Sequence, residues 1–184
     1  MVLNLPNTLT ATRILLIPFM VASIYLPGGW GKIVPTAIFG IAALTDWADG
    51  YVARNWQMSS AFGRFFDPVA DKLLVISALM LLVAEQRAPV VLVLLITARE
   101  ITITALREFM AGVGGTVPVS RLGKWKTGFQ MTAILMLLVQ DGLWGLPLDW
   151  PGLISLYICT ILTLWSGYDY LAGAWTQIRE RIGG

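Results

Sequence analysis

The chain has 184 residues, of which 57% are hydrophobic and only 13% are charged, and its formal net charge is +2. Its mean hydropathy is +0.72, and because a soluble domain of this length could not bury so much apolar surface, the composition excludes an ordinary soluble protein and indicates a membrane protein. The length suits a single domain covering residues 1–184. The sequence has no histidine, so any metal site would use oxygen ligands, which suit Mg²⁺ or Mn²⁺.

Six apolar segments follow one another along the chain, and turn-forming residues separate them. They cover residues 9–26, 33–54, 63–85, 89–110, 124–140 and 151–177. Because lipid cannot satisfy free backbone groups, we expect each segment to be a helix that spans the membrane. The N-terminal segment lacks the basic region and cleavage site of a signal peptide, so we expect it to be retained. The sequence therefore predicts an all-α integral membrane protein with six transmembrane helices.

The basic residues favour one side of this arrangement. Six spans place both termini on the same side, and most arginines and lysines fall there, whereas Lys32 and Arg87 fall on the other side. The side that holds the termini carries Arg13, Arg54, Arg64, Arg107, Arg121, Lys124, Lys126, Arg179 and Arg181. Because cytoplasmic loops are enriched in basic residues, both termini are predicted to be cytoplasmic.

Four aspartates lie in the second and third segments, at Asp46, Asp49, Asp67 and Asp71. The members of each pair are three or four residues apart, so each pair projects from one face of a helix. At ~1.5 Å per residue, all four lie roughly 20–27 Å from the outer ends of their helices, on the cytoplasmic side of a ~30 Å hydrocarbon core. Four neighbouring carboxylates repel one another unless cations lie between them, so the pattern favours a divalent-metal site. The alternative is interfacial charges or ion pairs, such as Asp71 with Lys72.

The pattern around these aspartates resembles the signature of the CDP-alcohol phosphotransferase family. It reads Asp46-x-x-Asp49-Gly50-x-x-Ala53-Arg54, followed by Gly63, Asp67 and Asp71. The resemblance implies that the four aspartates hold two divalent cations, Mg²⁺ or Mn²⁺. It also implies that Asp71 is the catalytic base, which takes the proton of an attacking hydroxyl. The physical logic agrees, because two metals would neutralise a pyrophosphate before an oxygen attacks it.

The same resemblance implies a pocket for CDP-diacylglycerol. Its residues would be Asn7, Thr10, Arg13, Gly50, Ala53, Arg54, Ser60 and Gly63. Small residues let the nucleotide approach the helix backbone, and an arginine fork suits phosphate oxygens. Alternatives remain open: Gly63 could serve helix packing alone, Ser60 could be a helix cap, and the residues before Arg13 could be an ordinary helix start.

The resemblance has further implications for architecture and location. The family's N-terminal segment, matched here by residues 5–13, is a short helix along the cytoplasmic interface. The family also implies a homodimer in the bacterial cytoplasmic (inner) membrane, with its active site facing the cytoplasm.

The downstream half resembles the members that form phosphatidylglycerophosphate, through residues 99–108 and 119–127. This implies that sn-glycerol 3-phosphate attacks CDP-diacylglycerol and that CMP leaves. An acceptor with its own phosphate needs a second basic pocket, for which the candidates are Arg99, Arg107, Ser120, Arg121 and Lys124. A same-family acceptor such as serine, an inositol phosphate or a phospholipid is the main alternative, and a small cation transporter is a more distant one.

For several side chains of this half, the sequence leaves an alternative role open. Arg99 could pair with Asp49, Asp71 or Glu100 as a structural bridge. Lys126 could be only an anchor at the membrane surface, and Asp169 could orient one of the bases.

Overall fold

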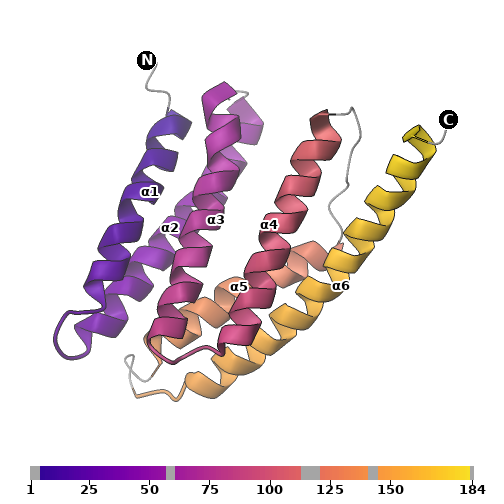
Figure 1. The fold of residues 1–184 in the computed structure, drawn as a ribbon. Coiled ribbons are helices and arrows are strands. Elements are labelled where there is room, and N and C mark those ends of the chain that lie inside the picture. Colours follow the sequence, from indigo (N-terminus) through magenta and orange to yellow (C-terminus); the bar gives the residue numbers. More distant parts are fainter. Residues whose placement is uncertain (1–4, 57–60, 113–120, 141–144, 183–184) are drawn as a thin grey trace. The chain divides into compact units, whose positions relative to one another are not determined.

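The structure, a computed structural model, describes residues 5–56, 61–112, 121–140 and 145–182, and within them the side chains of residues 11–45, 69–112, 122–140, 145–173 and 175. Over these residues the chain forms six helices and no strand (Figure 1). The helices are α1 (Leu5–Ser23), α2 (Trp30–Trp56), α3 (Ala61–Ala84), α4 (Val90–Gly112), α5 (Arg121–Val139) and α6 (Asp149–Ile182). The prediction of an all-α protein is therefore confirmed, and each apolar segment contains most of one helix.

The N-terminal residues differ from the expectation of a separate short helix. Residues 5–13 form the first turns of α1, which runs without a break from Leu5 to Ser23. The helical hydrogen bonds continue past Arg13 because no glycine or proline follows until Pro18, and α1 tolerates that proline inside the helix.

The chain divides into two compact units, one of Met1–Arg87 and Leu135–Asp149 and the other of Ala88–Ile134 and Trp150–Gly184. In the first unit, α1 packs against both α2 and α3. Met20 of α1, Phe39 of α2, and Leu74 and Leu79 of α3 are almost completely buried. These side chains join the two helices that carry the four aspartates to a common partner, α1.

The connection between α1 and α2 depends on a close backbone approach at Gly31. A Cβ atom on this residue would lie 2.7 Å from the carbonyl oxygen of Ile24 and 2.9 Å from that of Leu26. Real Cβ atoms do not approach backbone oxygens so closely, so only glycine fits without a shift of the chain. Gly31 therefore sets how tightly α2 returns along α1.

Arg87 ties the connection between α3 and α4 to the end of α5. Its Nη1 donates to the carbonyl oxygen of Leu138 at 2.9 Å, and more weakly to that of Leu137 at 3.5 Å. The last carbonyls of a helix have no partner within the helix, and a cation beside them is favourable. Arg87, which the sequence placed only on the less basic side, therefore caps α5.

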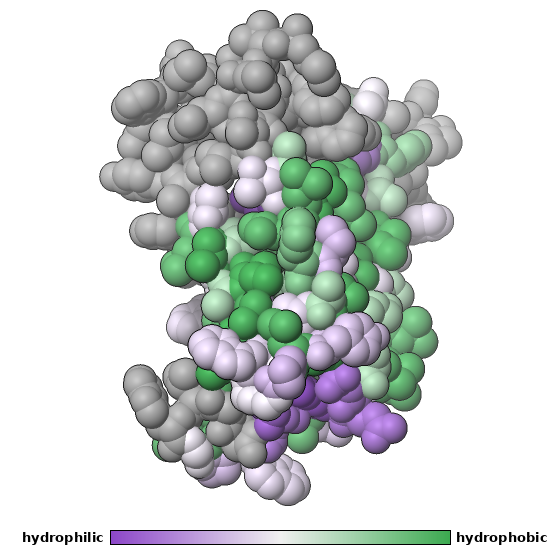
Figure 2. Space-filling model, turned by 90° about the vertical axis from the view of Figure 1, so that its left-hand side faces the viewer, coloured by the Kyte–Doolittle hydropathy of each residue, from purple (hydrophilic) through white to green (hydrophobic). Residues whose placement is uncertain are grey.

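Apolar side chains are exposed over parts of both units. One described stretch, Asp149–Gly173 of α6, is long and apolar enough to cross a membrane, and Ala11–Ser23 and Trp30–Thr45 are shorter apolar stretches. On α1 and α2, Leu15, Phe19 and Leu44 are each more than 60% exposed. Figure 2 shows the side on which α1 lies, where hydrophobic side chains gather above a group of hydrophilic ones. Exposed apolar surface of this kind is typical of contact with lipid or with another chain.

Candidate functional site

The four aspartates lie on two helices of the first unit. Asp46 and Asp49 belong to the second half of α2, and Asp67 and Asp71 to the first half of α3. Asp71 is partly buried and is not without an interaction partner. The other three carboxylates lie outside the described side chains, and the described ones contain no cluster of three metal-ligating residues. The two-metal site therefore stays a prediction.

Most side chains of the predicted CDP-diacylglycerol pocket also lie outside the described side chains. Asn7, Thr10, Gly50, Ala53, Arg54 and Gly63 are described only as helix backbone, and Ser60 lies outside the described residues. Arg13 is the exception, because its side chain is described and is only 4% exposed. Burying a guanidinium is costly unless polar groups receive it, so Arg13 marks a polar region within the first unit.

A buried ionic cluster lies in the second unit, formed by Arg99 and Glu100 of α4 and Lys126 of α5. Nη1 of Arg99 donates to Oε1 of Glu100 at 3.0 Å, and Nζ of Lys126 pairs with the same oxygen. Glu100 and Lys126 are each 4% exposed. Two cations thus share one carboxylate oxygen away from water, where charge interactions are strong.

Helix α6 completes the surroundings of Arg99. Nη2 of Arg99 donates to Oγ of Ser166 at 2.8 Å, and the Ser166 hydroxyl donates in turn to the carbonyl oxygen of Thr163 at 3.2 Å. Gly167 gives the arginine room, since a Cβ there would lie 3.1 Å from Cγ of Arg99. The guanidinium is therefore held by its partners on both α4 and α6.

Tyr170 of α6 connects this cluster to Arg107, two turns further along α4. Nη2 of Arg107 donates to Oη of Tyr170 at 2.8 Å. The guanidinium carbon of Arg107 lies 5.0 Å from the centre of the Tyr170 ring, and that of Arg99 lies 5.5 Å from it. Both distances are within the range of cation–π attraction. One buried aromatic ring therefore contacts two arginines.

Arg99 and Lys126 thus pair with one carboxylate, Glu100, and Tyr170 brings a third cation, Arg107, close to Arg99. Arg99 and Arg107 carry like charges beside the same ring, and because Arg107 is exposed, water screens part of the repulsion between them. An anion beside the arginines would relieve this repulsion, and arginine forks suit the geometry of a phosphate. The arrangement is chemically suited to bind a phosphate group.

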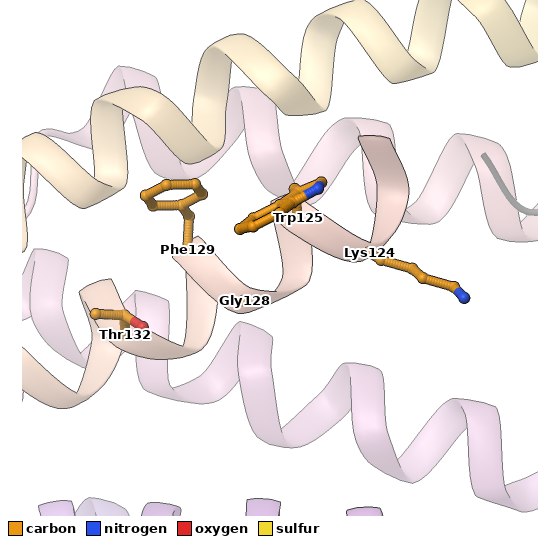
Figure 3. Close-up of a pocket in the computed structure, with 5 residues that line it drawn as sticks. All are labelled: Lys124, Trp125, Gly128, Phe129 and Thr132. Carbon is orange, nitrogen blue, oxygen red and sulfur yellow. The ribbon is translucent and has the colours of Figure 1, made fainter. Parts of the chain in front are cut away.

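The structure does not show the other residues predicted to contact the acceptor phosphate, Ser120, Arg121 and Lys124, in the ionic cluster. Lys124 is exposed on α5, where Trp125, Gly128, Phe129 and Thr132 line a groove of about 510 Å³ with it. Figure 3 shows that the Lys124 side chain extends away from the two aromatic rings. Arg121 is described only as the first residue of α5, and Ser120 lies outside the described residues.

The structure also bears on the alternative roles that the sequence left open for Arg99, Lys126 and Asp169. Of the partners considered for Arg99, the structure shows Glu100. Lys126 is buried and paired, which does not fit an anchor at the membrane surface. Asp169 is exposed.

Sequence reasoning missed Ser166 and Tyr170 as part of this site. Both belong to an apolar helix, yet Thr163, Ser166 and Tyr170 follow one another at spacings of three and four, so they share one face. A polar stripe at helical spacing in an apolar segment was the available signal.

The chain is similar to known proteins over nearly all of its length. A sequence model of a family described as CDP-alcohol phosphatidyltransferase matches residues 3–165. A protein of Salmonella typhimurium (strain LT2), named CDP-diacylglycerol–glycerol-3-phosphate 3-phosphatidyltransferase, is 45% identical over 175 residues, which are 93% of this chain and 94% of that protein. A protein of Escherichia coli (strain K12) with the same name is 43% identical over 182 residues, which are 97% of this chain and 98% of that protein.

Proposed function

Because the chain belongs to the CDP-alcohol phosphatidyltransferase family, we propose that it transfers the phosphatidyl group of CDP-diacylglycerol to sn-glycerol 3-phosphate. The products are phosphatidylglycerophosphate and CMP. The observation that carries the choice of an acceptor with its own phosphate is the group of Arg99, Arg107 and Lys126 around Glu100 and Tyr170. A neutral acceptor such as serine has no need of three cations beyond those that receive the pyrophosphate.

The residues present fit two divalent cations. Four carboxylates occupy positions one helical turn apart on α2 and α3, and the chain has no histidine, so the donor set is the hard oxygen set that Mg²⁺ and Mn²⁺ prefer. Asp46, Asp49, Asp67 and Asp71 would hold the cations, whose role when bound is to neutralise the pyrophosphate of the lipid nucleotide.

The chain's own residues would perform the transfer as a direct displacement. Asp71 takes the proton of the C1 hydroxyl of glycerol 3-phosphate, and that oxygen forms a bond to the phosphorus that carries the diacylglycerol. The bond between this phosphorus and the CMP oxygen breaks, and CMP leaves. Arg54 and Arg13 receive the negative charge of the nucleotide, with Asn7, Thr10, Gly50, Ala53, Ser60 and Gly63 around it.

The proposal includes the arrangement in the membrane. Six spans place both termini and the active site on the cytoplasmic side of the bacterial inner membrane, where both water-soluble partners of the reaction, glycerol 3-phosphate and CMP, are found. A homodimer is proposed from the family alone. The apolar α6 stretch and the exposed apolar side chains of α1 and α2 support contact with lipid.

An acceptor panel tests the proposal. Purified protein in detergent with CDP-diacylglycerol should release CMP with glycerol 3-phosphate, and not with serine, an inositol phosphate or a phospholipid. A chelator should stop the release, and Mg²⁺ or Mn²⁺ should restore it. Asp71→Asn should abolish turnover in a folded protein, whereas Asp149→Asn at the start of α6 should not. Release with serine but not with glycerol 3-phosphate would refute the acceptor, and normal turnover of Asp71→Asn would refute the base.

A further inference from the structure

The geometry points to Tyr170 as a positioning residue that holds Arg99 and Arg107 together as a receptor for the phosphate of the acceptor. The inference rests on the proposed function. It explains how two arginines that are far apart along one helix can bind the same phosphate.

The spacing of the two arginines explains why a residue from another helix is needed. Arg99 and Arg107 are eight residues apart on α4, which separates their backbones by roughly 12 Å along the helix axis. Their guanidinium carbons nevertheless lie 5.5 and 5.0 Å from the centre of the same Tyr170 ring. The two charges are thus no farther apart than the sum of these distances, and Tyr170 attracts both.

The two arginines depend on Tyr170 to different degrees. Arg99 also donates to Glu100 and Ser166. For Arg107, the hydroxyl of Tyr170 is the hydrogen-bond acceptor that the described residues provide, at 2.8 Å. Tyr170 itself is only 5% exposed, so its ring cannot turn freely in solvent. A guanidinium that is oriented before binding loses less conformational freedom when a phosphate arrives.

This difference gives two distinct substitutions. Tyr170→Phe removes the acceptor of Arg107 and keeps the ring, so it should raise the KM for glycerol 3-phosphate about 3- to 10-fold. Tyr170→Leu removes the ring as well and should raise that KM further, roughly 10- to 100-fold, because both arginines lose their contact. In both variants the KM for CDP-diacylglycerol should stay within about twofold of the wild type, since a positioning role for the acceptor leaves lipid binding alone.

Tyr168 offers a matched control on the same helix. It is 73% exposed, and Tyr168→Phe and Tyr168→Leu make the same chemical changes without touching the arginines. Both control variants should keep the wild-type KM for either substrate. Thermal unfolding of every variant shows whether it is folded, and Tyr170→Phe, which removes a single oxygen atom, carries the test if Tyr170→Leu does not fold.

The outcomes separate this inference from the proposed function. A selective rise in the KM for glycerol 3-phosphate in the Tyr170 variants supports it. An unchanged KM, equal rises for both substrates, or a fall in kcat alone overturns the inference and leaves the proposed function intact. A wild-type protein that releases no CMP with glycerol 3-phosphate overturns the proposed function, and the inference with it.

Discussion

Replacing Glu100 with glutamine removes the carboxylate that Arg99 and Lys126 share. The side chain keeps its size, so the change acts on charge and not on volume. In the wild-type protein Glu100 and Lys126 are each 4% exposed, and the Arg99 side chain is 12% exposed. After the change, the two cations remain buried beside a neutral amide.

The expected magnitude follows from this burial. Removing one partner of a buried ion pair costs about 3–5 kcal/mol, because the remaining charge is left without compensation. For a chain of this length, each kcal/mol lowers the unfolding temperature by roughly 2–4 °C, so Glu100→Gln should lower it by roughly 6–20 °C. Adding Lys126→Met removes one of the two buried cations that pair with Glu100 in the wild type. The double variant should therefore recover a large part of the lost unfolding temperature.

The assay is thermal unfolding of the purified protein in one detergent at a fixed lipid content. Glu108 of the same helix is exposed, and Glu108→Gln is therefore the matched control, with an expected shift of at most about 2 °C. If Glu100→Gln shifts the unfolding temperature no more than Glu108→Gln does, the cluster is not buried as described. If the double variant is less stable than Glu100→Gln, Lys126 is not the charge that loses its partner.

Two glycine substitutions test close contacts in the two units. Gly167→Ala should lower the unfolding temperature and raise the KM for glycerol 3-phosphate severalfold, because its Cβ would lie 3.1 Å from Cγ of Arg99. At Gly173 on the same helix a Cβ would meet no described atom within 4 Å, so Gly173→Ala should leave that KM unchanged and should not lower the unfolding temperature, since alanine favours a helix over glycine. Equal behaviour of the two variants would contradict the contact at Gly167. Gly31→Ala should cost about 1–3 kcal/mol of stability, since its Cβ would meet two carbonyl oxygens. Gly29→Ala, with nothing within 4 Å, should be close to neutral, and a neutral Gly31→Ala would show that the connection adjusts easily.

The positions of the helices could be predicted because long apolar segments separated by turn residues leave few alternatives. The ends could not be predicted as well. Helix α1 begins at Leu5, within a polar stretch that hydropathy passes over, and α6 continues to Ile182 through charged residues that are good helix formers. Hydropathy reports where a helix can meet lipid and not where its hydrogen bonds end.

In the candidate site, the sequence predicts which side chains share a helix face but not which side chains from different helices pair. The spacing of Asp67 and Asp71 is local, so the sequence could place both on one helix face. The pairing of Glu100 with Lys126 joins residues 26 apart, and that of Arg107 with Tyr170 joins residues 63 apart. Such pairs depend on how α4, α5 and α6 pack against one another. The pattern of residues within one segment gives no information on this packing.

The single cysteine has a practical consequence. Cys159 is completely buried in α6, next to the hydroxyl of Thr163. Water-soluble thiol reagents need an accessible sulfur, so the folded wild-type protein is expected to react with them slowly. Cysteines introduced at Gly29 and Gly112, where a Cβ atom would meet no atom of the described residues within 4 Å, would then be the fast-reacting thiols. The wild-type chain is thus a low-reactivity control for thiol labelling at these two positions, which tests the proposed arrangement in the membrane.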